Sequence, residues 1–284
     1  MMRPRTLRSS VALAALLLAV TGTACKSGGP ADDPILRLSA AESLAQGKEL
    51  MARNKYSRAR PYLSHAYEAE PNSIGGREGL LLLADSYYLD GGGANWIQAE
   101  AKYRDFLNRF PTSDQAAYAQ YQIANSLARR IEKPNRDQSP TRKAVEAYRE
   151  LLRLYPTSDY TAEAEGKLEE MRDHLAAAEF VVGDFYLSYR YPYGAIQRFE
   201  SLLEEFPGYE GTDKVLYHLG IAYRRSRIPE DRQKAIDTFQ RLAREYPESR
   251  WTAKIPDLGD LPAAAPEEPE KVAADADGAD GAGR

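Results

Sequence analysis

Small and apolar residues recur at fixed distances before five prolines. The prolines are Pro71, Pro111, Pro156, Pro207 and Pro247. Twelve residues before each stands an alanine: Ala59, Ala99, Ala144, Ala195 and Ala235. Large apolar residues stand eight before (Leu63, Tyr103, Tyr148, Phe199, Phe239), and further apolar residues five before (Ala66, Phe106, Leu151, Leu202, Leu242). Steps of four and three residues share one helix face, so the pattern predicts five helices, each ended by its proline.

A second helix is expected upstream of each of these. It carries a small residue and, three positions later, a larger apolar one: Gly47/Leu50, Ala84/Tyr87, Ala124/Leu127, Gly183/Tyr186 and Gly220/Tyr223. Insertions at 90–96, 132–140 and 228–232 are expected to separate the helices of units two, three and five. Unit four instead reads as one continuous helix from about Thr161 to Arg190. The "TSD" after Pro111 and Pro156 is expected to supply the N-cap of the next helix.

This arrangement resembles the tetratricopeptide repeat (TPR), in which small-x-x-aromatic is followed by Ala-x-x-x-aromatic-x-x-small and Pro. The resemblance implies an all-α protein, a right-handed α-solenoid of about five TPR-like helix pairs over residues 40–253. The units are expected at about 40–71, 76–111, 114–156, 160–207 and 211–247. Such stacks present a long concave surface suited to binding other proteins.

The N-terminus has the features of a secretory signal. Arg3, Arg5 and Arg8 precede an apolar run at 11–20, which is too short to span a bilayer, and small residues lead to Cys25. Cys25 is the only cysteine, so no internal disulfide is possible. The context resembles the bacterial lipobox, which implies a signal peptide at 1–24, a covalent lipid on Cys25 that anchors the chain to a membrane, and a linker at 25–39.

Charge is concentrated at the C-terminus. Residues 255–284 hold eight acids and two bases, a net charge of −6, whereas the whole chain carries −4. This segment is rich in Pro, Ala, Asp and Gly and has no aromatic residue, so 254–284 is predicted to be a disordered acidic tail. The remainder has no strong basic character, which argues against nucleic-acid binding.

The sequence offers no catalytic or metal-binding motif. His65, His174 and His218 lie far apart and match no metal-ligand spacing. The triple glycine at 91–93 lacks the Gly-Lys-Ser/Thr of a phosphate loop, and no G-x-S-x-G elbow is present. The sequence therefore predicts a non-enzyme with no metal and no cofactor apart from the lipid.

The stretch "YLSYRYPYG" at 186–194 carries the most unusual side chains. It lies at the expected turn between the two helices of unit four. Because exposed tyrosine and arginine are favoured in protein interfaces, Tyr189, Arg190, Tyr191 and Tyr193 are candidate partner-binding residues. Core packing is the alternative for these side chains.

A lipid-anchored chain of five such units resembles the BamD family, lipoproteins of the outer-membrane β-barrel assembly machinery. The most specific likeness is the Y-P-x-S-x-Y-x-x-x-A turn at 155–164, followed by "RDHLA" and "DFY". The resemblance implies a non-catalytic scaffold on the periplasmic face of the outer membrane. It implies docking to a POTRA domain of the barrel-forming subunit through Arg198, other assembly lipoproteins as partners, and N-terminal units that receive unfolded outer-membrane proteins.

Two other classes of protein share features with this sequence. A periplasmic TPR adaptor, such as the Tol-Pal coordinator, usually carries an N-terminal coiled coil, for which the segment 25–40 is too short. A peptidoglycan hydrolase with a TPR domain would need a catalytic domain, and no stretch outside the expected solenoid is long enough to form one.

Overall fold

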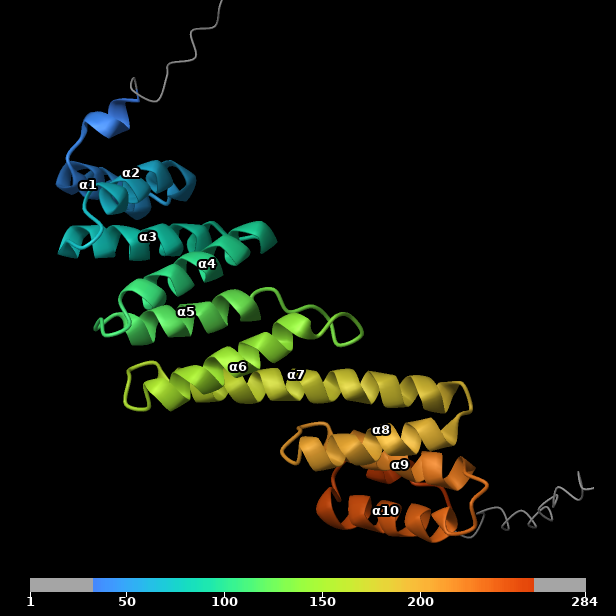
Figure 1. The fold of residues 1–284 in the computed structure, drawn as a ribbon. Helices are drawn as coiled ribbons and strands as arrows, with labels where there is room; N and C mark the ends of the chain where they lie inside the picture. The colour runs from blue at the N-terminus through green and yellow to red at the C-terminus, as the bar shows by residue number, and fades with distance from the viewer. Residues whose placement is uncertain (1–32, 258–284) are drawn as a thin grey trace, which may run out of the picture.

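The computed structural model describes residues 33–257, which form ten α-helices stacked in sequence order (Figure 1). The helices are α1 (Ala40–Ala52), α2 (Tyr56–Ala69), α3 (Ile74–Asp90), α4 (Gly93–Arg109), α5 (Ala116–Ala128), α6 (Ser139–Leu154), α7 (Thr161–Ser188), α8 (Pro192–Glu205), α9 (Thr212–Arg225) and α10 (Asp231–Glu245). Short 3-10 helices flank them, η2 (Pro34–Arg37) and η3 (Thr252–Lys254). Within residues 33–257 there is no strand, and the predicted all-α class is confirmed.

The helices form a one-dimensional stack. Each packs mainly against its neighbours in sequence, with smaller contacts between α1 and α3 and between α7 and α9. The chain therefore descends from α1 at the top of Figure 1 to α10 at the bottom, and the two ends of the stack lie far apart. This is the α-solenoid of helix pairs that the repeat predicted.

The residues that define the repeat make up its interior. The alanine, large apolar and third positions of all five units are at most 1% exposed. The small residues of the upstream helices face these positions directly. A methyl group added at Gly183 or Gly220 would overlap the ring of Phe199 or Phe239. Each glycine therefore lets its helix approach the large side chain of the paired helix closely.

The prolines end the second helix of each unit. α2, α4, α6, α8 and α10 all stop two residues before their proline. The residue between is a C-cap that has left the helical conformation, with φ from −127° to −138° and ψ from 55° to 67°. The helix ends there because the ring of a following proline crowds a helical residue before it.

Two details of the connections differ from expectation. The "TSD" segments do not cap helices: α5 and α7 have no side-chain cap, and Ser113 and Ser158 each lie inside two successive tight turns. Backbone N–H and C=O groups pair with each other in those turns, so α5 and α7 begin only at Ala116 and Thr161. The connection in unit two is also shorter than the expected 90–96, because Gly91 and Gly92 alone reverse the chain with φ of 74° and 87°.

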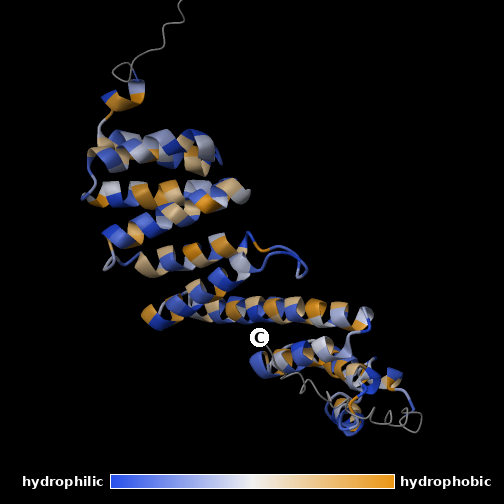
Figure 2. Cartoon of the chain, turned by 45° about the vertical axis from the view of Figure 1, so that its right-hand side comes forward, coloured by the Kyte–Doolittle hydropathy of each residue, from blue (hydrophilic) through white to orange (hydrophobic). Residues whose placement is uncertain are grey.

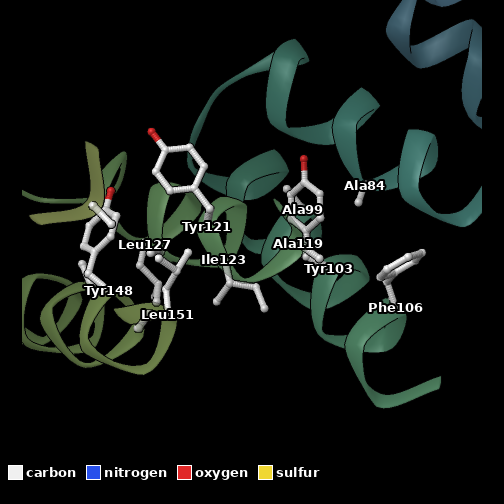
Figure 3. Packing of buried hydrophobic residues seen from close by; sticks show 14 of the residues in the cluster. Ala84, Ala99, Tyr103, Phe106, Ala119, Tyr121, Ile123, Leu127, Tyr148 and Leu151 are labelled. Carbon is white, nitrogen blue, oxygen red and sulfur yellow. The ribbon is translucent and has the colours of Figure 1, made fainter. Parts of the chain in front are cut away.

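α7 joins two hydrophobic clusters. It has 28 residues, whereas the other nine α-helices have 13 to 17. Its first half, with Ala164 and Met171, completes a cluster built by α3–α6, part of which is seen in Figure 3. Its second half, from Ala176 onward, completes a cluster built with α8–α10. A smaller cluster joins α1, α2 and α3.

Candidate partner-docking surface

The C-terminal half of α7 carries an uncovered apolar face. α6 packs on the first half of α7, and in Figure 1 the second half extends beyond it. Val181, Val182, Phe185 and Tyr189 are exposed there, Phe185 at 55% and Tyr189 at 73%. Val181, Phe185 and Tyr189 are spaced four residues apart and so share one helix face. We call these four residues the α7 stripe; hydrophobic positions along α7 are orange in Figure 2.

The helix ends in a turn that holds Arg190 in a left-handed conformation. Arg190 has φ of 57°, and its N–H donates to the carbonyl of Leu187 at 3.2 Å. The N–H of Tyr191 donates to the carbonyl of Tyr186 at 2.9 Å. These two bonds form a Schellman cap, whose left-handed position is usually glycine or asparagine. An arginine there is conformationally costly, and such strain is often found at functional positions.

Tyrosines connect the α7 stripe to the turn. Ring centroids are 4.5 Å apart for Phe185 and Tyr189, 5.9 Å for Phe185 and Tyr186, 5.8 Å for Tyr186 and Tyr191, and 6.3 Å for Tyr191 and Tyr193. All except Tyr186 are exposed. The aromatic surface is therefore continuous from the helix face to the start of α8, and the contacts between its rings favour this arrangement.

A groove with a positive lining lies beside these tyrosines. Its volume is about 1010 Å³, and its lining residues are Leu187, Ser188, Arg190, Tyr191, Pro192, Tyr193, Arg225 and Arg227. Arg225 donates from Nη1 to the carbonyl of Leu187 at 3.3 Å, which brings the end of α9 against the end of α7. We call it the arginine groove. Among residues 33–257, no acidic residue lines the groove and no ion pair involves Arg190, Arg225 or Arg227.

A groove of this composition suits carboxylates. Arginine presents planar N–H donors that match a carboxylate oxygen pair, and tyrosine hydroxyls add further donors. The aromatic rings beside it supply apolar area that a partner surface can cover.

The model of a family described as "outer membrane lipoprotein" (YfiO) matches residues 38–234 of this chain. The match runs from before α1 into α10 and includes both the α7 stripe and the arginine groove. The chain belongs to the BamD (YfiO) family.

Three similar proteins carry the name "Outer membrane protein assembly factor BamD". The one from Rickettsia prowazekii is 26% identical over 238 residues, covering 84% of this chain and 92% of the relative. The one from Caulobacter vibrioides is 26% identical over 247 residues, covering 86% and 78%. The one from Haemophilus influenzae is 25% identical over 244 residues, covering 81% and 91%. The likeness therefore extends over most of each chain.

Arg198 lies apart from the arginine groove of this BamD-family chain. It is on α8, about half exposed, and its Nη1 lies 3.3 Å from Oε2 of Glu179 on α7. The shallow pocket around Arg198 is lined by Gln197, Glu200, Ser201 and Glu204. The structure thus brings Tyr189, Arg190, Tyr191 and Tyr193 together but places Arg198 in a separate, partly acidic pocket.

The sequence did not single out Arg225, Arg227 and Phe185. A spacing of four between Phe185 and Tyr189 could have indicated a shared helix face. No local sequence pattern distinguishes Arg225 and Arg227, because they join the groove only when α9 packs beside α7. Cys25, the lipid, the signal peptide and most of the acidic tail lie outside the described residues.

The three histidines serve separate helices of the BamD-family fold. The ring nitrogens of His65, His174 and His218 contact the carbonyls of Leu38, Glu132 and Lys214 at 3.0, 2.8 and 2.7 Å. Among residues 33–257, no group of three or more His, Cys, Asp or Glu side chains could hold a metal ion. In the same range, no helix is both long and apolar enough to cross a membrane.

A polar network crosses the N-terminal half. Asp85 accepts hydrogen bonds from the hydroxyls of Tyr103 at 2.6 Å and Tyr118 at 2.8 Å, and no cation pairs with it in the described part of the chain. Gln122 donates to the Tyr118 hydroxyl, which extends the network along α5. Burial raises the pKa of Asp85 above its ordinary value, although the two tyrosine hydrogen bonds oppose the shift.

Proposed function

We propose that this chain is a non-catalytic scaffold for the assembly of outer-membrane β-barrel proteins. Membership of the BamD family and relatives named as outer membrane protein assembly factors support this role. The scaffold docks to a periplasmic POTRA domain of the barrel-forming subunit. The lipid on Cys25 holds it at the periplasmic face of the outer membrane, beside other assembly lipoproteins, and its N-terminal units receive unfolded substrates.

The arginine groove and the α7 stripe together carry this proposal. An exposed aromatic face beside three arginines that have no ion pair within residues 33–257 is the composition of an interface centre. We assign the docking contact to Tyr189, Arg190, Tyr191 and Tyr193, extended by Phe185, Arg225 and Arg227. The partner surface is expected to offer carboxylates to the groove and apolar side chains to the stripe.

Arg198 provides a second, exchangeable contact. Its present partner Glu179 lies on the neighbouring helix, and both side chains are partly exposed. Such surface pairs contribute little to stability, about 0–1 kcal/mol. A partner carboxylate can therefore replace Glu179 at small cost, which keeps Arg198 in the proposed interface without a role in the fold.

The test is co-purification of the tagged, lipidated full-length protein in mild detergent, with partners quantified by mass spectrometry. The wild type is expected to carry a POTRA-bearing β-barrel protein in near-equal amount. The double variant Arg225→Glu/Arg227→Glu should lose most of it, because the two substitutions place acidic groups opposite partner carboxylates.

The control is Arg241→Glu/Arg244→Glu on the surface of α10, which changes the net charge equally but lies outside the groove. Equal recovery of the barrel protein with both double variants would remove the groove from the interface. Recovery of Tol-Pal components without any barrel protein would instead make the chain a different periplasmic adaptor.

A further inference from the structure

The described chain ends against α9, the helix that carries Arg225. Trp251, just after α10, packs against Tyr217 of α9 with ring centroids 5.0 Å apart. Eight residues of helix separate Tyr217 from Arg225, an axial distance of about 12 Å. Residues 258–284 follow, and the root-mean-square span of a random-coil segment with that number of residues is roughly 30 Å. The groove is therefore well within their reach.

The same segment is the most acidic part of the protein. Residues 258–284 contain seven acidic residues and two basic ones, and Glu267, Glu268 and Glu270 stand nearly side by side. Two other pockets of the described residues carry acidic side chains. In the pocket between α4 and α6, Glu100, Glu146 and Glu150 balance Arg104, Arg142 and Lys143, and Glu200 and Glu204 line the pocket around Arg198. Among residues 33–257, the arginine groove has no acidic lining residue.

We propose that the acidic tail, residues 258–284, is an intramolecular ligand of the arginine groove and competes there with the docking partner. The carboxylates around Glu268 pair with Arg190, Arg225 and Arg227, whose guanidinium groups have no ion pair within residues 33–257. The tail thereby covers the groove in the free protein and leaves it on docking. The competition rests on the proposed function, whereas the contact between tail and groove does not.

The expected strength is modest. A tethered segment of this length acts at an effective concentration on the order of millimolar, so even weak pairing occupies the groove for much of the time. Occupancy of 50–90% would lower the partner's apparent affinity by about 2- to 10-fold. Because exposed charges are screened by salt, occupancy should fall between 0.05 and 0.5 M salt.

The contact is tested by photo-crosslinking in the lipidated full-length protein. Benzoylphenylalanine replaces Tyr191 in the groove or, as the control, Tyr56 at the equivalent turn of unit one. The expected result is an intramolecular crosslink from position 191 to the tryptic peptide 255–271, absent from position 56. The neutralised tail Glu267→Gln/Glu268→Gln/Glu270→Gln should reduce its yield several-fold, as should 0.5 M salt.

The outcomes separate the two proposals. No crosslink from position 191 to the tail, or an equal yield with the neutralised tail, would overturn the intramolecular contact. The competition is tested by ending the chain after Asp257, which leaves all ten helices intact. Partner affinity should then rise about 2- to 10-fold, and an unchanged affinity would overturn the competition. Loss of partner binding in Arg225→Glu/Arg227→Glu tests the docking role by itself.

Discussion

At the scale of single residues, Arg190 and Asp85 are two positions where the effect of a side chain on folding stability can be measured separately from its role. Arg190 occupies a left-handed backbone site where it lacks the freedom of glycine, and yet its guanidinium lines a groove. Asp85 is a buried carboxylate held by two hydroxyl groups instead of a cation. We expect the fold to be less stable with Arg190 or Asp85 than with glycine or asparagine at the same position. Replacing each residue therefore measures what its side chain contributes.

Replacing Arg190 with glycine should stabilise the fold and weaken docking. Glycine adopts φ of 57° without the steric cost that arginine bears, so the free energy of unfolding should rise by up to about 1 kcal/mol. The affinity for the POTRA-bearing partner should fall. Chemical denaturation and a binding titration on the same samples measure both effects.

Asn54 is the matched control, since it occupies the left-handed position at the end of α1, with φ of 56°. Asn54→Gly should leave partner affinity unchanged. If Arg190→Gly also binds normally, the arginine serves only the turn.

Asp85→Asn should reduce the pH dependence of stability. Burial raises the folded-state pKa of Asp85 above the ordinary 3.8, so its ionisation opposes folding. The protonated carboxyl group therefore favours the folded state. This stabilisation is fully present below pH 3.8 and is lost as pH rises through the raised pKa of Asp85. Denaturant unfolding from pH 3.5 to pH 8 should therefore show the wild type losing stability relative to Asp85→Asn as pH rises. Parallel curves for the two proteins would mean that Asp85 ionises as easily in the folded state as in the unfolded one.

At the scale of helices, the repeat works because a small residue on one helix meets a large one on its partner. Ala195 on α8 is fully buried, and Gly183 on α7 faces Phe199 of the same helix pair. The close approach of α7 and α8 at Gly183 is matched by that of α9 and α10 at Gly220, where an added Cβ would likewise overlap a phenylalanine ring. Because protein interiors pack as densely as organic crystals, such a contact leaves little room for additional side-chain volume.

Ala195→Leu should overfill this contact and destabilise the protein by roughly 1–3 kcal/mol. The melting temperature should fall by several degrees. Ala162→Leu is the matched control, because Ala162 is exposed on the first turn of α7 and the added side chain meets solvent. An equal melting temperature for Ala195→Leu and wild type would show that the interface between α7 and α8 can relax around three extra carbon atoms.

At the scale of the whole molecule, two clusters meet on one helix. α3–α6 with the first half of α7 form one, and α8–α10 with the second half form the other. Stacked units of this kind interact mainly with their neighbours, so the two halves are expected to differ in local stability.

Gly183→Val should therefore disrupt the C-terminal cluster first. The added carbons overlap the ring of Phe199, and the clash lies on the side of α7 that faces α8. Hydrogen exchange measured by mass spectrometry should lose protection in α8–α10 while α3–α6 remain protected. Loss of protection along the whole chain at once would mean that the solenoid unfolds as a single unit.

The sequence predicted the features that rest on local spacing. Helix number, the buried face of each pair and the proline stops follow from periodicity and from the chemistry of proline, and they agree with the structure. The sequence predicted too late a start for α4, because two glycines with positive φ can reverse the chain in fewer residues than composition suggests. The arginine groove could not be predicted, since Arg225 and Arg190 are brought together only by the packing of α9 beside α7.

The length of α7 has a mechanical consequence. A helix of 28 residues is a rod of about 42 Å, held by α6 along one half and by α8 and α9 along the other. A force applied to its exposed face at Phe185 and Tyr189 exerts a torque on the half of α7 that packs against α6. A rotation of about 5° would move the far end by roughly 4 Å. The rod can thus act as a lever that converts a small tilt of whatever docks at one end into a displacement among the N-terminal units.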